Sequence, residues 1–394
     1  MDKMEFTRGN LQEEPPKRIK KKSHRRWLYL ALAVGAVLLI VLCAVLWDST
    51  AFDGLRRDVI YAKAEKDENG CALLYRYAAE KDQRCAYLDG SLVLASQHSI
   101  SVISEGGQEL YQADIKFHKC AVTQKNGTAA VYDIGGREIY LLDRRGLLRR
   151  METGGEILSC SLSEGGELTV TTGGNGYKAV VSVYDQDGVL RFEYKSSDRF
   201  LMTAITSRSG RQMAAVTMGQ AEGVFSSSVV FYRTDSEEMQ ADCMLPGGAV
   251  YDLGVTGGNY CAVAENGLFF IGKDGTQQAF FDFEGAFLRR CSLRGNGYAA
   301  VVLGQYKTGG GTTLVTVSDR GEVLGRAEIE GEVLSVDSAG KYVAVLCSDS
   351  LTIYDKKMNL CSELKDVSAA RTVLMRPDGS ALLVGAESAS LYLP

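Results

Sequence analysis

The chain has 394 residues, of which 45% are hydrophobic and 24% charged, and its formal net charge at pH 7 is −5. This composition excludes a disordered chain and a collagen-like chain. The 43 glycines and only 5 prolines favour many short strands joined by tight turns, and the length allows two ordinary domains or one large all-β domain.

Residues 1–26 form a basic cytoplasmic tail with nine Lys or Arg and four Asp or Glu, so the rest of the chain carries a net charge of −10. An acidic main body argues against nucleic-acid binding, which needs a basic surface. Five cations stand just before the next segment, and we interpret them as topology determinants: Lys20, Lys21, Lys22, Arg25 and Arg26. The same cluster resembles a nuclear localisation signal or a lipid-binding patch, but orienting the next segment is sufficient to explain it.

Residues 27–47 carry no charge and have a Trp at each end. About 20 residues span a bilayer as a helix, so these 21 residues predict a single transmembrane helix. Because the cations precede it, we expect the N-terminus in the cytoplasm and everything after Trp47 outside the cell membrane. A signal peptide cleaved near Ser49-Thr50-Ala51 stays open as the alternative, although the apolar core of a signal peptide is shorter.

Residues 48–69 form a polar juxtamembrane connector with room for a short helix. From residue 70 onward the chain repeats one pattern: an apolar strand, Asp or a substitute, a short turn that usually contains Gly, and another apolar strand. The pattern recurs at intervals of 36 to 48 residues, around Ser104, Asp143, Asp185, Arg233, Gly272, Asp319 and Asp355. A period of about 40–45 residues is typical of β-propeller blades.

Each repeated unit divides into four short strands, which in the third unit lie near 157–162, 168–171, 179–184 and 189–194. The first strands of successive units are expected near residues 84, 116, 157, 200, 249, 287, 333 and 371. This predicts an all-β propeller of eight blades over residues 70–394, with seven blades as the alternative. The last unit has only three strands, and a strand near 71–77 is expected to supply the fourth and close the ring, which removes its open edge.

The layout of basic tail, membrane helix and propeller, together with segments such as Tyr87–Ser96 (YLDGSLVLAS), resembles an uncharacterised bacterial family, domain-of-unknown-function family 5711, found mostly in Firmicutes. The resemblance covers the whole chain. It implies a membrane-anchored propeller and no particular activity. More distantly, the units are similar to WD40-type and quinoprotein-type blades. The characteristic tryptophans of those blades are missing, because both Trp residues lie in the predicted membrane helix.

No motif in the sequence carries a catalytic or metal-binding signature. His98, between two strands, and His118, expected on an inner strand, lack the spacing of a metal site. There is no nucleophile elbow and no phosphate-binding loop. Asp185–Gly188 resembles the start of a calcium loop but lacks the later ligands, so we interpret it as a turn. We therefore expect no catalytic residues, no metal and no cofactor.

Nine of the ten cysteines follow the predicted membrane helix, an odd number that cannot all pair within one chain. Cys71 and Cys361 are expected on the outer strands of neighbouring blades and form the one disulfide candidate. The cysteines flanked by apolar strand residues are expected to fill the core as small hydrophobes: Cys160, Cys261, Cys291 and Cys347.

Propellers usually bind at the mouth of the central channel, through the loops between the second and third strands of each blade. These loops are longest in units three, four and six. They supply our candidate binding residues, which include three aromatic side chains: Tyr177, Gln220, Glu222, Phe225, Gln305, Tyr306 and Lys307. The alternative is that these are merely longer hairpins whose rings fold onto the blade.

Together these observations predict a membrane-anchored, extracytoplasmic module that binds or scaffolds a protein or cell-envelope partner, and not an enzyme. The main alternative is a cell-envelope hydrolase or lyase that uses carboxylates and the Arg289-Arg290 pair in the propeller channel, because a fold does not define an activity. A third hypothesis is a ligand sensor that signals through dimerisation of the helix, whose small residues include Ala31, Gly35 and Ala36.

Overall fold

The computed structural model describes residues 29–30, 32–37, 41, 50–62, 64–174, 176–221, 224–236, 238–306 and 309–394. The chain divides into two compact units, Met1–Asp53 and Gly54–Pro394. The described residues of the predicted membrane helix are helical, and no helix within the described ranges is long and apolar enough to cross a membrane. The predicted topology determinants, Lys20 to Lys22, Arg25 and Arg26, lie outside the described residues.

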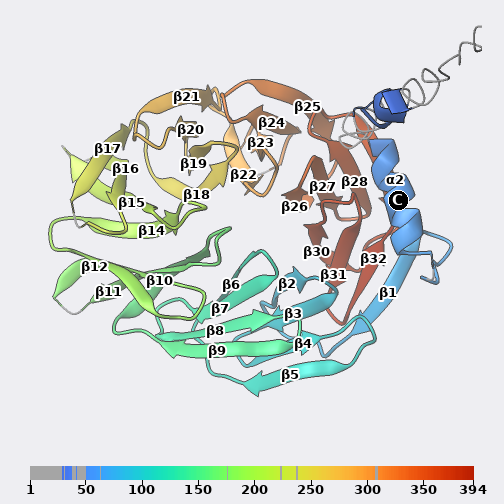
Figure 1. Ribbon diagram of the computed structural model, residues 1–394, viewed down its shortest axis with the longest axis horizontal. Coiled ribbons are helices and arrows are strands. Elements are labelled where there is room, and N and C mark those ends of the chain that lie inside the picture. The colour runs from blue at the N-terminus through green and yellow to red at the C-terminus, as the bar shows by residue number, and fades with distance from the viewer. Residues whose placement is uncertain are drawn as a thin grey trace, which may run out of the picture. The chain divides into compact units, whose positions relative to one another are not determined.

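The second unit is a β-propeller. Its described strands form eight antiparallel sheets of four strands each, arranged as blades around a central axis (Figure 1). We number the blades from β2, so that blade 1 contains β2–β5 and blade 8 combines β30–β32 with β1. The predicted count of eight is confirmed, and the alternative of seven is excluded.

In blades 1 to 7 the strands follow one another in chain order outward from the axis, whereas in blade 8 the outermost strand is β1. Helix α2 (Thr50–Ile60) precedes β1. The innermost strands of blades 1 to 8 are β2 (Arg84–Leu88), β6 (Cys120–Lys125), β10 (Glu156–Leu162), β14 (Phe200–Thr206), β18 (Val250–Thr256), β22 (Phe287–Ser292), β26 (Val333–Ala339) and β30 (Ala370–Met375). The second strands are β3 (Ser91–Ala95), β7 (Thr128–Asp133), β11 (Leu168–Gly174), β15 (Gln212–Ala221), β19 (Asn259–Ala264), β23 (Tyr298–Gly304), β27 (Tyr342–Cys347) and β31 (Ala381–Gly385). The third strands are β4 (Ser99–Ile103), β8 (Glu138–Asp143), β12 (Tyr177–Tyr184), β16 (Val224–Arg233), β20 (Gly267–Ile271), β24 (Thr312–Ser318), β28 (Ser350–Asp355) and β32 (Ser388–Tyr392). The outermost strands are β5 (Glu109–Asp114), β9 (Gly146–Glu152), β13 (Leu190–Ser196), β17 (Met239–Leu245), β21 (Gln277–Asp282), β25 (Val323–Ile329), β29 (Leu360–Lys365) and β1 (Cys71–Arg76).

The predicted starts of the inner strands agree with the structure to within one residue in every blade except blade 2, where β6 begins four residues later than expected. Residues 115–119 form the linker from blade 1 instead, and Ile115 N donates a hydrogen bond to His98 O (2.8 Å). His118 therefore lies in this linker and not on an inner strand, which corrects the prediction. Its Nδ1 is 3.0 Å from Oδ2 of Asp133.

The ring closes as predicted, through pairing of the first and last strands. β1 is antiparallel to β32, with Cys71 opposite Tyr392, and Leu393 N donates to Gly70 O (3.0 Å). Cys71 and Cys361 do lie on the outer strands of neighbouring blades, β1 and β29. Both thiols are free, however, so the disulfide candidate is wrong.

The core consists of apolar layers between neighbouring blades. The second strands are buried on both faces, as in β23 and β27, where every residue is buried. This explains why they appear in the sequence as continuous apolar runs without alternation. The rings of Phe231 in blade 4 and Tyr260 in blade 5 illustrate such a layer, with centroids 5.2 Å apart. Cys160, Cys261 and Cys347 are buried there, as predicted, whereas Cys291 is half-buried.

The recurrent Asp of the sequence repeat marks the turn between the third and outermost strands. In blade 3, Oδ1 of Asp185 accepts hydrogen bonds from the backbone N of Asp187 (3.0 Å) and Val189 (2.8 Å). These bonds, of which that from Val189 matters most, lower the pKa of Asp185. Gly188 completes the turn with φ +73°. The segment is therefore the turn that its sequence predicts.

A β-bulge is repeated near the start of the inner strand in blades 3 to 8. One residue there has no partner on the second strand, so the alternation of buried and exposed side chains shifts at that point. The bulged residues are Leu158, Met202, Tyr251, Arg289, Leu334 and Arg371.

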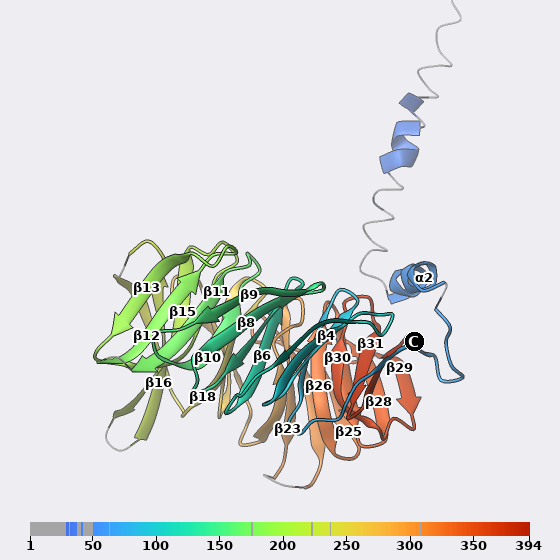
Figure 2. The same ribbon diagram turned by 90° about the horizontal axis from the view of Figure 1, so that it is seen from below.

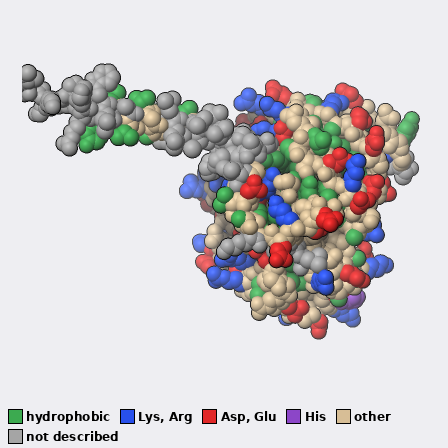
Figure 3. All heavy atoms as spheres, turned by 90° about the vertical axis from the view of Figure 1, so that its right-hand side faces the viewer, with side chains coloured by type: hydrophobic (Ala, Val, Ile, Leu, Met, Phe, Trp, Pro, Cys, Tyr) green, Lys and Arg blue, Asp and Glu red, His purple; other side chains and the backbone are tan. Residues whose placement is uncertain are grey.

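The strand ends define two faces of the propeller. The upper face carries the hairpins between the second and third strands and the linkers between blades. The lower face carries the turns between the first and second strands and between the third and outermost strands. Helix α2 is bound at the lower face, where Arg57 donates hydrogen bonds to Asp378 O (2.6 Å) and Pro394 O (3.0 Å). In Figure 2, α2 lies on the side of the ring opposite to the end of the β15–β16 hairpin. Lys and Arg are mixed with Asp and Glu over the side that carries blades 7 and 8 (Figure 3).

Candidate binding face

Exposed aromatic side chains gather on the upper face. In the described part of the propeller five aromatic side chains are exposed, by 38 to 62%, and all five lie at upper strand ends or in an upper hairpin of blades 3 to 6. A cluster of exposed rings on one face is typical of a binding surface. We call this set the aromatic arc: Tyr177, Phe200, Tyr251, Phe287 and Tyr306.

The exposure of this part of the inner strands follows from the bulges. Leu201 and Val250 are buried, and the next residues, Met202 and Tyr251, are the bulged ones and are exposed. Phe200 precedes Leu201 and faces the opposite way, so it is exposed as well. The bulges therefore turn apolar side chains of blades 4 and 5 toward solvent at the channel mouth.

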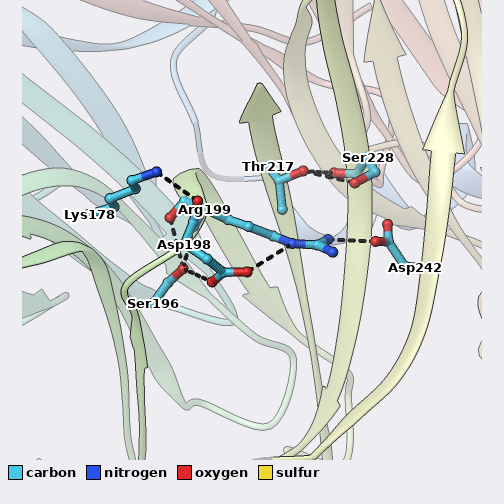
Figure 4. Close-up of polar contacts among 7 residues, drawn as sticks. All are labelled: Lys178, Ser196, Asp198, Arg199, Thr217, Ser228 and Asp242. Atoms are coloured by element: carbon cyan, nitrogen blue, oxygen red, sulfur yellow. Dashed lines mark hydrogen bonds and ion pairs between the residues drawn. The ribbon is translucent and has the colours of Figure 1, made fainter. Parts of the chain in front are cut away.

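A polar network holds the linker between blades 3 and 4 (Figure 4). Ser196 Oγ donates a hydrogen bond to Arg199 O (2.8 Å), and Lys178 Nζ donates to Asp198 O (2.8 Å). Nη1 of Arg199 is 2.5 Å from Oδ2 of Asp242 on the outermost strand of blade 4. This hydrogen bond raises the pKa of Arg199. The linker is thus tied to both blades that it joins.

Two lysines of blade 3 contact rings of the aromatic arc. Phe200 follows the linker directly, and Nζ of Lys178 lies 5.2 Å from its ring centroid. Nζ of Lys195 lies 5.9 Å from the centroid of Tyr177. Both distances are within the range of cation–π attraction. A cavity of about 240 Å³ opens beside Tyr177, and Glu193 and Lys195, an ion pair at 2.7 Å, contribute to its lining.

Arg289 of the inner strand shapes the upper hairpin of blade 6. Nη2 of Arg289, the bulged residue of β22, donates hydrogen bonds to Tyr306 O (3.2 Å) and to Gly309 O. Arg290 binds elsewhere, with Nε donating to Leu334 O in blade 7 (3.4 Å). The Arg289-Arg290 pair of the enzyme hypothesis thus binds backbone carbonyls in two directions and does not converge on one point.

Two carboxylates lie on inner strands in unusual environments. Asp252 lies on inner strand β18 and is exposed to water although protein surrounds much of it, and it accepts a hydrogen bond from Leu253 N (2.8 Å). This partial loss of hydration raises the pKa of Asp252. Asp337 is buried, which raises its pKa although Arg294 opposes the shift from 2.8 Å. Among the described residues no group of three or more His, Cys, Asp or Glu is placed to hold a metal ion.

The seven predicted binding residues belong to upper hairpins of blades 3, 4 and 6. Three have exposed side chains: Tyr177, Gln305 and Tyr306. Two lie opposite each other in the pairing of β15 with β16: Gln220 and Phe225. Two fall outside the described residues: Glu222 and Lys307. Their role in binding stays a prediction.

Loop length alone did not reveal Phe200, Tyr251 and Phe287, which begin inner strands and do not lie in loops. A signal in the sequence was available for Phe200. Phe200-Leu201-Met202 is an apolar run at the start of an inner strand, and a strand cannot bury three successive side chains on one face. The bulge at Tyr251 has no comparable signature in a single sequence.

Comparison with solved structures shows the propeller fold. The C-terminal WD40 domain of Sif2 is 11% identical, with a TM-score of 0.58, and the match covers 81% of this chain and 99% of that one. The computationally designed Ika8 protein is 11% identical, with a TM-score of 0.54, and the match covers 81% of this chain and 99% of that one. BamB from Moraxella catarrhalis is 14% identical, with a TM-score of 0.49, and the match covers 81% of this chain and 97% of that one. At these identities the likeness to the Sif2 domain and to Ika8 concerns the fold alone.

A search of curated proteins finds no relative that matches this sequence. The model of the family of unknown function DUF5711 matches residues 74–365, which is well over half of the chain and runs from β1 to the end of β29. The chain therefore belongs to the DUF5711 family of β-propellers of unknown function.

Proposed function

We propose that this protein is a membrane-anchored, extracytoplasmic binding module that holds a protein or cell-envelope partner on the upper face of its propeller. The observation that carries the proposal is the aromatic arc. Aromatic rings supply much of the binding energy at protein interfaces, and here the exposed rings of the described propeller share one face across four consecutive blades.

The attachment of α2 supports the choice of face. The chain enters the propeller at the lower face, where Arg57 and Tyr61 contact Asp378. In the proposal, the uncharged segment 27–47 is the membrane anchor and reaches the propeller through α2. The upper face is then free to meet a partner.

The enzyme hypothesis has one observation in its favour, the raised pKa of Asp252 on inner strand β18. A general acid commonly has such a pKa. Among the described residues, however, Asp252 is hydrogen bonded to the backbone of Leu253 and to no side chain. A catalytic carboxylate usually works with a second oriented group, so we rank this hypothesis below binding.

The test is crosslinking of the full-length protein in its native membrane, followed by mass spectrometry of the captured material. We expect one recurrent partner. Its capture should fall at least tenfold in a variant with Phe200→Ala, Tyr251→Ala and Tyr306→Ala. The matched control removes equally exposed apolar side chains at the lower ends of outermost strands: Leu190→Ala, Val323→Ala and Leu360→Ala.

Retention of the partner by the arc variant, or its loss in the control variant, would refute the assignment of the upper face. Turnover of a cell-wall polymer by the purified protein, abolished by Asp252→Asn, would move the assignment to the enzyme hypothesis.

The topology of the protein is tested separately with the variant Met244→Cys, because Met244 is 75% exposed near the end of β17. A membrane-impermeant maleimide should label this variant in intact cells; labelling only after lysis would place the propeller inside.

A further inference from the structure

The upper hairpin of blade 4 differs from its counterparts in the other blades. In six blades the pairing of the second and third strands does not extend above the inner and outermost strands. In blade 3 it extends above them by one pair, Gly174 with Tyr177. In blade 4, β15 and β16 continue for three described pairs beyond both neighbours. We call residues 219–221 and 224–226 the blade 4 ribbon; its turn, residues 222–223, lies outside the described residues.

Both neighbouring strands leave the sheet below the ribbon. The last pair of β14 with β15 joins Phe200 and Met218. The last pair of β17 with β16 joins Leu245 and Ser227, and Pro246, which has no N–H to donate, follows. Within the described residues, no strand therefore covers either edge of the ribbon. Figure 2 shows this hairpin reaching beyond its neighbours on the side opposite to α2.

A two-stranded ribbon presents a row of backbone N–H and C=O groups on each edge. Such an edge is a template for another extended chain, and proteins usually protect it with Lys, Pro or a covering segment. The sequence of the hairpin from 219 to 226, GQAEGVFS, contains neither Lys nor Pro. The β15 edge leads directly to exposed Phe200 and Met202, which offer apolar contacts to a chain that pairs there.

We propose that an extended peptide segment of a protein partner adds as a strand to the β15 edge of the blade 4 ribbon, and that side chains of this peptide pack against Phe200 and Met202. The inference rests on the proposed function and narrows it from any partner to an unfolded or loop segment of a protein. Strand addition takes affinity from main-chain hydrogen bonds and specificity from alternate side chains. Three ribbon pairs offer few hydrogen bonds, so binding also requires the neighbouring rings.

The probe is a linear peptide selected from a display library of unconstrained twelve-residue sequences against the full-length protein. The main variant replaces residues 219–226 by Asn-Gly, so that a two-residue turn connects Met218 to Ser227. These two residues are already paired, and a two-residue Asn-Gly turn closes such a hairpin. In the matched control Asn-Gly replaces only residues 222–223, so the length of the hairpin stays the same. We expect the first variant to lose at least tenfold in affinity for the selected peptide and the control to keep it.

A second measurement identifies the mode of binding. Each amide of the selected peptide is replaced in turn by an ester, which removes one N–H donor. Strand addition predicts a loss of affinity at every second position and little change between, because only alternate amides face the partner strand. A uniform response, or equal binding to the shortened variant, overturns the proposal.

Other occupants give different outcomes. A second copy of this chain on the ribbon would appear as a dimer in analytical ultracentrifugation that the shortened variant abolishes, and it would overturn the proposal. Failure to select any peptide, together with binding of isolated wall glycan, would overturn it too. The shortened variant could capture the native partner as well as the unchanged protein does, while the variant with Phe200→Ala, Tyr251→Ala and Tyr306→Ala loses it. In that case the strand-addition proposal is wrong and the proposed function stands.

Discussion

Gly275 shows how single residues determine the turns of this propeller. It occupies the left-handed position of the turn between the third and outermost strands of blade 5, at φ +78°, and a Cβ there would lie 2.2 Å from Cβ of Ala241. Gly107 has the same role in blade 1, at φ +75°, with open space around it. Both turns are closed by the same backbone hydrogen bond, of 2.9 Å.

Alanine substitutions at Gly107 and Gly275 separate the cost of backbone strain from the cost of a steric clash. Gly107→Ala is expected to cost about 1 kcal/mol, the approximate cost of a left-handed conformation for a residue with a Cβ. Gly275→Ala adds a clash with a neighbouring blade and is expected to cost about 3 kcal/mol or more. Denaturant unfolding of residues 50–394 measures both. Equal losses would show that the contact with Ala241 relaxes without cost.

Asp252 makes the stability of the propeller depend on pH. Its pKa is raised in the folded protein, so the folded state holds the proton more tightly than the unfolded chain. Stability contributed in this way is present below the ordinary pKa of Asp, about 3.9, and is lost as pH rises through the raised value. Asp252→Asn cannot ionise and is expected to raise the thermal midpoint at pH 7 but not near pH 3. Asp114→Asn, on exposed β5, controls for the removal of one negative charge. A gain that is the same at both pH values contradicts the assignment.

At the scale of residues the sequence predicted part of the candidate site. Tyr177 and Tyr306 were found because they lie in or beside long hairpins, and hairpin length is visible in a sequence. Tyr251 was missed because its exposure depends on a bulge, and a bulge depends on how two distant strands pair. The position of Phe200 depends on the network of Arg199 with Asp242, two residues that are 43 positions apart.

Among the elements, the inner strands of blades 6, 7 and 8 are joined by one carboxylate. Asp337 on β26 accepts hydrogen bonds from Arg294 Nη1 (2.8 Å), Met375 N (2.9 Å) and Ser292 Oγ (3.2 Å). These donors come from the loop after β22, from β30 and from β22 itself. Removing this buried acceptor deprives Met375 N and Arg294 Nη1 of it, whereas Ser292 Oγ keeps its contact with Ser338 Oγ (2.8 Å).

Asp337→Ala is therefore expected to destabilise the propeller by about 2 kcal/mol, the order expected when buried donors lose their acceptor; the Arg294 side chain, 41% exposed, can turn to water instead. Asp337→Asn keeps an acceptor oxygen and should cost less than half of that. Thermal and denaturant unfolding of the two variants measure the difference. Asp349→Ala, in the upper hairpin of blade 7, is the control and should change stability by less than about 0.5 kcal/mol. An equally mild result for Asp337→Ala would mean that water replaces the carboxylate.

The elements themselves were largely predictable, because each blade repeats the same apolar runs and the same Asp-containing turn. The one displaced inner strand is that of blade 2. Its linker imitates a strand because Ile115 and Phe117 alternate with polar residues, yet their backbone N–H groups bind carbonyls of the upper hairpin of blade 1. Such a competition between two partners for the same backbone cannot be decided from a local pattern.

For the whole molecule, the count of strands was the informative quantity. Three strands remained at the C-terminal end and one at the N-terminal end, and a closed ring needs four in every blade. The structure confirms this closure. Tyr75 on β1 is fully buried and donates a hydrogen bond to Gly90 O in blade 1 (2.9 Å), so β1 also joins blade 8 to blade 1. The membrane helix and the location of the propeller stay predictions.

Closure by β1 predicts how truncated chains behave. A chain of residues 66–394 keeps β1 and loses α2 with its hydrogen bonds from Arg57, so its thermal midpoint should fall by only a few degrees, about 2–4 °C for each kcal/mol lost. A chain of residues 78–394 also loses β1. It exposes the whole edge of β32 and empties the site of Tyr75, which together should lower the midpoint by about 10 °C or more and cause association through the open edge. Calorimetry and sedimentation of the two chains measure both effects. If residues 78–394 are as stable and monomeric as residues 66–394, the ring is held by the layers between blades alone, and pairing of the chain ends is dispensable.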